Sequence, residues 1–172
     1  MKFLDIAKKR YSCRSYLSKP VENEDLMKIL EVGRVAPTGC NRQPQRIIVV
    51  QSEEGLNKIK KAANTFGAPM ILIVCGDSSV TWKRAYDGKN IVDIDISIVT
   101  THMMLQATEL GLGSLWMCSF KPDIIKDEFN IPKNLEPINL LAIGYESGEI
   151  ASPERHNDLR KPLKDTVSFE KY

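Results

Sequence analysis

One long apolar segment, residues 91–110, restricts the folds open to this chain more than any other feature. Its first part alternates polar and apolar residues as a strand does, but strands rarely exceed about ten residues, so its length favours one helix. Apolar side chains would then point to several sides of that helix: Ile94, Ile98, Val99, Met103, Leu105 and Leu110. A helix that is apolar all round must be buried on all sides. Because a chain of 172 residues can hardly achieve this alone, we expect a homodimer.

Shorter patterned segments supply the rest of the fold. The pattern is helical at residues 3–10, 21–36, 54–64 and 121–130. Buried strands are expected at 46–50, 69–76 and 138–145, and a strand or a tight turn at 113–120. These strands do not alternate regularly with helices, as they would in a doubly wound fold. We therefore predict a single α+β domain over residues 1–172, with a central mixed sheet covered by helices.

Charge and cysteine usage exclude several classes of protein. The formal net charge is only +2, which argues against a surface built to hold nucleic acid. The cysteines lie tens of residues apart, so they lack the spacing of metal ligands, and we expect no metal site. The sequence shows neither an apolar run that could cross a bilayer nor a secretory signal, so we expect no membrane partner. Free thiols then indicate a cytoplasmic protein.

Residues 8–16, KKRYSCRSY, concentrate positive charge in an otherwise nearly neutral chain. In an extended segment, a spacing of two places Arg10, Ser12 and Arg14 on one side. Two guanidinium groups and a hydroxyl group are well matched to a phosphate. The alternative is a solvated helix end whose cations complement the helix dipole, and this segment alone does not decide between the two.

Residues 36–44, APTGCNRQP, have the composition of a loop and lead into a strand. Asn41 and Gln43 carry both hydrogen-bond donors and acceptors, which could read the edge of a heterocycle. The alternative is an ordinary loop. Residues 111–116, GLGSLW, lack the third glycine of a dinucleotide-binding motif and follow a helix, so Gly111 is better explained as a helix cap.

Taken in order, these segments resemble the FMN-dependent nitroreductase family over nearly the whole chain. The matching motifs are Arg10-x-Ser12-x-Arg14, Pro37-Thr38-x-x-Asn41-x-Gln43-Pro44, Gly111-Leu112-Gly113-x-x-Trp116 and Arg160-Lys161-Pro162-Leu163. Two positions depart from the family pattern. Gln45 stands where an aromatic residue is frequent, and Cys118 stands where a glycine is common.

The resemblance implies a set of residues that bind the cofactor. The set is Arg10, Tyr11, Ser12, Arg14, Pro37, Thr38, Asn41, Gln43, Met117, Cys118, Arg160 and Lys161. Arg10, Ser12 and Arg160 would hold the FMN phosphate. Arg14 would reach the pyrimidine end of the ring, where a cation stabilises the reduced flavin. The loop at 37–41 would line the ring, with backbone amides of residues 117–118 at its other edge.

The same resemblance implies an oxidoreductase that takes a hydride from NAD(P)H and passes reducing equivalents to a small acceptor such as a nitroaromatic or a quinone. It also implies an intertwined homodimer with FMN at its interface. Two alternatives stay open: a flavoprotein of the same fold that carries out dehalogenation or flavin destruction, and a non-catalytic FMN-binding protein. The motifs contain neither a Cys–His pair nor paired carboxylates. We therefore expect no catalytic side chain, and the hydride chemistry would belong to the cofactor.

Overall fold

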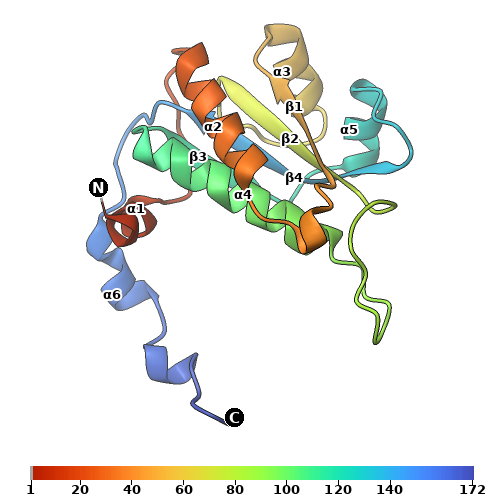
Figure 1. Ribbon diagram of the computed structural model, residues 1–172. Helices are drawn as coiled ribbons and strands as arrows, with labels where there is room; N and C mark the ends of the chain where they lie inside the picture. The colour runs from red at the N-terminus through yellow and green to blue at the C-terminus, as the bar shows by residue number, and fades with distance from the viewer. Residues whose placement is uncertain (1) are drawn as a thin grey trace.

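The apolar run at residues 69–76 becomes the centre of the sheet. In the computed structural model, which describes residues 2–172, this run forms β2 (Met70–Asp77), and all of its residues are buried. β2 pairs antiparallel with β1 (Gln45–Val50) on one side and with β4 (Leu135–Gly144) on the other. β3 (Gly113–Met117) pairs antiparallel with β4, which gives the strand order β1-β2-β4-β3 (Figure 1).

Two details of the sheet differ from the sequence prediction. The strand predicted as fully buried at 46–50 is β1, an edge strand in which only Val50 is buried. The three strand pairs are all antiparallel, and the parallel component of the expected mixed sheet is limited to an isolated bridge between Ser12 and Ser114. The predicted α+β class, with a sheet covered by helices, is confirmed.

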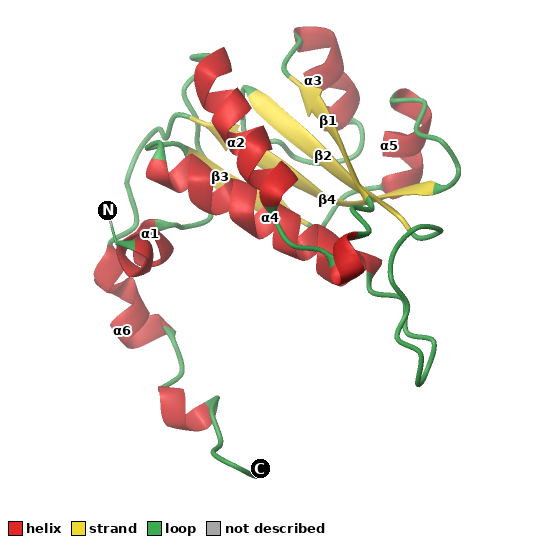
Figure 2. Cartoon of the chain, viewed as in Figure 1, coloured by secondary structure: helices red, strands yellow, loops and turns green. Residues whose placement is uncertain are grey.

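Helices cover both faces of the sheet, as Figure 2 shows. Because the side chains of a strand alternate between faces, β2 contributes to two separate cores. One core is shared with α2 (Asn23–Val35) and α4 (Val92–Glu109). The other core is shared with α3 (Glu53–Lys60) and α5 (Pro122–Glu128). The sheet is therefore the middle of three layers.

The segment that begins at residue 91 forms the long helix α4, as its length predicts. One side of α4 is buried against the sheet and α2 through residues such as Ile96, Val99 and Met103. The other side is open, because Ile94 is 47% exposed and Ile98 is only partly buried. A single chain thus covers one side of α4 and leaves an apolar strip on the other.

The N-terminal helix and the C-terminal tail lie close to each other near the C-terminal end of α4 (Figure 1). α1 (Phe3–Lys9) packs on α4. The tail passes α1 as the short segments η2 (Pro153–Arg155), α6 (His156–Leu159) and η3 (Leu163–Asp165). Residues 157–172 are exposed throughout and extend away from the sheet. Within residues 2–172, no helix combines the length and the apolarity that crossing a membrane requires.

A buried polar pair joins α4 to β4. Thr100 and Asn139 are both 0% exposed. The Thr100 hydroxyl group donates to the Ile96 carbonyl at 2.8 Å and accepts from Asn139 Nδ2 at 3.1 Å. Because water does not reach this position, the Asn139 side chain depends on Thr100 for this hydrogen bond.

Thr100→Val should lower the free energy of unfolding by about 1–3 kcal/mol, because it leaves the buried Asn139 amide without its partner. Urea unfolding at a fixed protein concentration measures the change. The double variant Thr100→Val/Asn139→Leu should recover most of the loss, because it removes both polar partners together. Equal stability of the wild type and Thr100→Val would contradict the role given to this pair.

Candidate functional site

Residues 10–16 run in an extended conformation from the end of α1 along the start of β3. Ser12 forms a parallel bridge with Ser114, and the Cys13 N–H donates to the Ser114 carbonyl at 3.0 Å. Cys13 points inward and is 1% exposed, whereas Ser12 and Arg14 are exposed. Arg14 Nη1 donates to the Ser12 carbonyl at 3.4 Å. Ser12 and Arg14 therefore share the outer side of this segment, as their spacing predicts.

Arg155, which the sequence analysis did not select, ties the C-terminal tail to this segment. Its guanidinium group donates to the Arg10 carbonyl at 2.5 Å and to the Lys8 carbonyl at 3.1 Å. The His156 Nε2 atom lies 3.1 Å from the Lys8 carbonyl and adds a further hydrogen bond. Lys8 is in the last turn of α1, where carbonyl groups lack partners within the helix. A cation at this end also complements the helix dipole.

Three arginines gather where the tail meets α1: Arg10, Arg155 and Arg160, here called the arginine cluster. Burial lowers the pKa of Arg10, and the charges of Arg155 and Arg160 lower it further. The ion pairs found in residues 2–172 include none of these three side chains. Positive charge therefore accumulates without an ion-pair partner, at a point two residues before Ser12 in the chain. Guanidinium and hydroxyl groups are donors that proteins use to bind phosphate.

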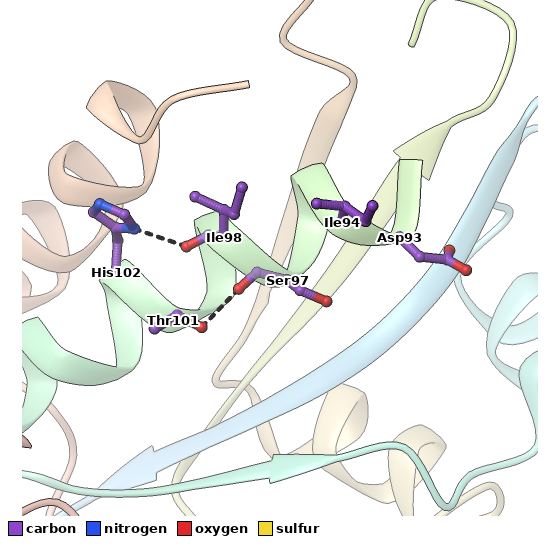
Figure 3. A pocket seen from close by; sticks show the side chains of 6 residues that line it. All are labelled: Asp93, Ile94, Ser97, Ile98, Thr101 and His102. Atoms are coloured by element: carbon purple, nitrogen blue, oxygen red, sulfur yellow. Dashed lines mark hydrogen bonds between the residues drawn. The ribbon is translucent and has the colours of Figure 1, made fainter. Parts of the chain in front are cut away.

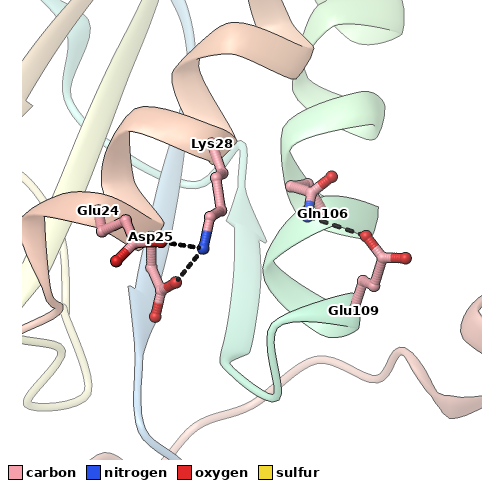
Figure 4. A network of polar contacts seen from close by, with 5 residues as sticks. All are labelled: Glu24, Asp25, Lys28, Gln106 and Glu109. Carbon is pink, nitrogen blue, oxygen red and sulfur yellow. Dashed lines mark hydrogen bonds and ion pairs between the residues drawn. The ribbon is translucent and has the colours of Figure 1, made fainter.

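Some charges on the helix surfaces are paired locally. Lys28 on α2 pairs with Glu24 at 2.8 Å and with Asp25 at 3.5 Å (Figure 4), and its hydrogen bond to Glu24 raises its pKa. In the same view, Gln106 on α4 donates to Glu109 at 2.9 Å. These exposed pairs leave no cation free for a ligand, in contrast to the arginine cluster.

The loop at residues 38–43 has an unusual backbone conformation. Cys40, Asn41 and Gln43 have φ angles of 49°, 53° and 50°, in the left-handed region that residues other than glycine seldom adopt. Hydrogen bonds within the loop hold this shape: the Gln43 N–H donates to Thr38 Oγ1 at 3.0 Å, and Gln43 Nε2 donates to the Asn41 carbonyl at 3.2 Å. Pro37 leads into the loop from α2 and is exposed, as is Asn41. The predicted ring-binding residues of this loop therefore lie at the surface.

The residues around Arg10 and the loop at 38–43 lie at opposite ends of α4 (Figure 1). Arg10 lines a small cavity of about 20 Å³ together with Thr108, near the C-terminal end of the helix. The Gly39 N–H of the loop donates to Asp95 Oδ1 at 2.8 Å, near the N-terminal end. With a rise of about 1.5 Å per residue, Asp95 and Thr108 are about 20 Å apart along the helix. One chain therefore brings the predicted site residues together as two groups but does not join the groups.

Three other predicted site residues, Tyr11, Lys161 and Met117, differ in how accessible their side chains are. Tyr11 lines the small cavity beside Arg10. Lys161 is exposed in the tail, one residue beyond Arg160. Met117 is buried at the end of β3, where its side chain belongs to the core between the sheet and α5. Only the backbone of Met117 is therefore available to a ligand.

The two positions that depart from the family pattern both carry polar groups. Gln45 Oε1 is buried and has no hydrogen-bond partner among residues 2–172. Cys118 is exposed, and its sulfur accepts a hydrogen bond from Trp116 Nε1 at 3.2 Å. Neither residue belongs to the arginine cluster, so the departures do not alter the candidate phosphate site.

The open side of α4 forms a shallow groove of about 440 Å³ (Figure 3). Its lining residues are Asp93, Ile94, Ser97, Ile98, Thr101 and His102. Thr101 Oγ1 donates to the Ser97 carbonyl at 2.7 Å, and His102 Nδ1 lies 2.8 Å from the Ile98 carbonyl. These polar groups are thus occupied, and the groove offers mainly apolar surface. Within residues 2–172, no group of three His, Cys, Asp or Glu side chains is placed to hold a metal ion.

Comparison with solved structures shows close relatives of this fold. The structure is similar to the crystal structure of a nitroreductase family protein from Clostridium difficile 630, with a TM-score of 0.98, 59% identity and 100% of each chain covered. It is also similar to an FMN-dependent nitroreductase from Clostridium difficile R20291, with a TM-score of 0.80 and 27% identity, covering 97% of this chain and 98% of that chain.

Sequence comparison leads to the same family. An FMN reductase (NAD(P)H) of Bacillus subtilis (strain 168) is 27% identical over 163 residues, which cover 84% of this chain and 66% of that protein. The model of the nitroreductase family matches residues 7–66 and 60–145, a region that contains both the Arg10 segment and the loop at 38–43. This chain therefore belongs to the nitroreductase family.

Proposed function

We propose that this chain is an FMN-dependent oxidoreductase that takes a hydride from NAD(P)H and passes reducing equivalents to a small acceptor such as a nitroaromatic or a quinone. The observation that carries the proposal is the arginine cluster, which offers the donors that a flavin phosphate needs. Two relatives are named as an FMN reductase and an FMN-dependent nitroreductase, which supports FMN as the ligand.

The two groups of residues would divide the binding of FMN between them. Arg10, Ser12 and Arg160 would bind the phosphate, and Arg14 would turn toward the pyrimidine end of the ring. Asn41, at the surface of the left-handed loop, would contact the ring edge. Bound FMN supplies hydride acceptance and donation. The protein orients the ring, and the fixed charge of Arg14 stabilises the negative charge that reduction adds.

A homodimer would bring the two groups together. In a two-fold dimer that buries the groove on α4, each chain uses the same surface. We propose that the two-fold axis is perpendicular to α4, so that the two α4 helices run antiparallel. The N-terminal end of one helix then lies beside the C-terminal end of the other. The loop at 38–43 of one copy therefore meets the arginine cluster of the second copy. Such a dimer would also bury Ile94 and Ile98, which a single chain leaves partly in water.

The C-terminal tail suits an intertwined arrangement of the two copies. Leu163 and Phe169 in the tail are 79% and 86% exposed. A second copy could remove this apolar surface from water, which is favourable. Arg155 fixes the point where the tail leaves its own chain, and Arg160 lies near Arg10. The later residues would then reach the partner.

The purified protein should be yellow and should release FMN, not FAD, on denaturation, because the arginine cluster provides for a single phosphate group. Anaerobic addition of NADH or NADPH should bleach the visible flavin absorbance. A colourless protein that also fails to bind added FMN at micromolar concentration would contradict the proposal. Bound FMN that neither nicotinamide bleaches would identify a non-catalytic FMN-binding protein instead.

Arg10→Ala should weaken FMN binding by about tenfold to a hundredfold, because a hydrogen bond to a charged group contributes about 1.5–3 kcal/mol. Fluorescence of free FMN during dilution of the loaded protein measures the dissociation constant. Arg34→Ala is the matched control, since Arg34 is an exposed arginine on α2 that pairs with Glu31. If both variants bind FMN as the wild type does, Arg10 is only a cation at a helix end.

Ile98→Asp should convert the dimer to monomers and should release FMN at the same time, because it places a charge in the apolar groove and separates the two groups. Sedimentation velocity with detection at a flavin wavelength reports both changes. Met27→Glu, at an exposed apolar position on α2, should stay dimeric and loaded. A stable monomer of Ile98→Asp that keeps its FMN would show that one chain holds the whole site.

A further inference from the structure

Two loops of the structure meet on one buried carboxylate, Asp95. It lies in the first turn of α4 and is 1% exposed. Its Oδ1 atom accepts from the Gly39 N–H at 2.8 Å, and its Oδ2 atom accepts from Thr81 Oγ1 at 3.0 Å. Gly39 belongs to the loop at 38–43, and Thr81 lies at the base of the loop at 78–90. Both loops are therefore attached to α4 through the same side chain.

The backbone of the loop at 38–43 packs closely at Gly39. A Cβ atom on Gly39 would lie 2.5 Å from Ile91 Cδ1 and 3.1 Å from Trp82 Cβ. A larger residue at position 39 would therefore require the Ile91 side chain to move and the contact with Trp82 to widen. The three left-handed residues follow directly after this point, so the Gly39 hydrogen bond fixes where the unusual conformation begins.

The loop at 78–90 is stiff enough to act as the second support. Lys83 and Asn90 form an antiparallel bridge, and Arg84 forms an ion pair with Asp87. Asn90 Nδ2 donates to the Ser78 carbonyl at 3.2 Å. Figure 1 shows the loop projecting beyond the N-terminal end of α4. Its position at the base depends on Thr81, whose hydroxyl group is bound by Asp95.

A carboxylate in this environment costs free energy that its contacts must offset. Transfer of a charged group from water to the interior is unfavourable, and the ion pairs found in residues 2–172 do not include Asp95. The N-terminal end of α4 favours a negative charge. Without Asp95, however, the Gly39 N–H and the buried Thr81 hydroxyl would lose their acceptor. Asp95 is therefore needed for the geometry of two loops.

We propose that Asp95 is the positioning residue for the flavin ring. It acts through Gly39, by holding the loop at 38–43 in the conformation that presents Asn41, and it touches neither the ring nor the phosphate. This inference rests on the proposed function, because the loop has a ring to read only if the chain binds FMN. It assigns Asp95 to ring binding alone, since the hydrogen bonds of Asp95 go to Gly39 and Thr81 and not to the arginine cluster.

Binding of FMN and of riboflavin, which lacks the phosphate, separates the two contributions. Full-length protein loaded with FMN is diluted to obtain the FMN dissociation constant, and riboflavin is measured by competition with bound FMN. Asp95→Ala should weaken both ligands by the same factor, about tenfold to a hundredfold, because hydrogen bonds to a charged acceptor are lost. Arg10→Ala should weaken FMN and leave riboflavin unchanged. The ratio of the dissociation constants of FMN and riboflavin therefore distinguishes an effect on ring binding from an effect on phosphate binding.

Conservative variants control for a purely structural effect. Asp95→Asn should stay within about threefold of the wild type, because its amide oxygen still accepts from Gly39 and its NH₂ group can donate to the Thr81 hydroxyl. Thr81→Val, which removes one donor, should weaken both flavins several-fold, and Thr81→Ser should restore wild-type binding. The comparison of Thr81→Val with Thr81→Ser tests the proposal even if Asp95→Ala does not fold.

Two results would overturn the proposal. The first is unchanged binding of both flavins by Asp95→Ala or Thr81→Val in folded protein. The second is a loss confined to FMN, which would place the effect of Asp95 on the phosphate. A wild-type protein that binds neither flavin would reject the proposed function and this inference with it, whereas wild-type binding with either of the two results rejects the inference alone.

Discussion

The burial of only one side of α4 is the constraint on which the rest of the structure depends. The inner side packs on the sheet and on α2, so the helix has a fixed position over the middle strands. Its two ends then determine where the attached segments lie: the extended Arg10 segment at one end, and the loop at 38–43 at the other. The apolar outer side is the surface on which we propose that two copies meet. The fold, the candidate site and the proposed dimer thus all depend on α4.

Charge is distributed in the structure according to whether a partner is present. On α2, cations such as Lys28 and Arg34 have carboxylates within one helical turn, and these exposed pairs contribute little to stability. Arg10 is the opposite case, because burial and two neighbouring arginines lower its pKa. Like charges held together in this way repel each other and store an unfavourable energy in the free protein. An anion bound between them would release that energy, which is the physical basis for a phosphate site here.

Much of this arrangement could be predicted from the sequence, because local rules govern it. The length of the apolar segment predicts α4, and the spacing of two predicts the exposed side shared by Ser12 and Arg14. Arg155 could not be found in this way, since its acceptors are backbone carbonyls 145 and 147 residues away. Every residue has a backbone carbonyl, so the sequence does not show which carbonyls accept these hydrogen bonds. The division of the candidate site into two groups could not be predicted either. The order of the motifs in the sequence does not show at which end of α4 each motif lies.

Burial could not be predicted from composition in two segments. The apolar residues of β1 predict a buried strand, but burial depends on how many neighbours a strand has, and β1 lies at an edge. Asp95 appears in the sequence as one polar residue of an alternating pattern, and the prediction of a helix did not say which side of the helix it would occupy. In the helix it faces inward. Asp93, two residues earlier in the same turn, is exposed, so an acidic residue in this helix does not by itself indicate burial.

The attachment of the tail has a consequence for how this protein can change over generations. Arg155 binds the carbonyl groups of Lys8 and Arg10, not their side chains. Every residue type offers the same carbonyl, so substitutions at positions 8 and 10 can alter the charge beside the candidate phosphate site without releasing the tail. The side chains at positions 8 and 10 can therefore change the charge that a ligand meets, while the backbone carbonyl groups of the same residues continue to hold the tail.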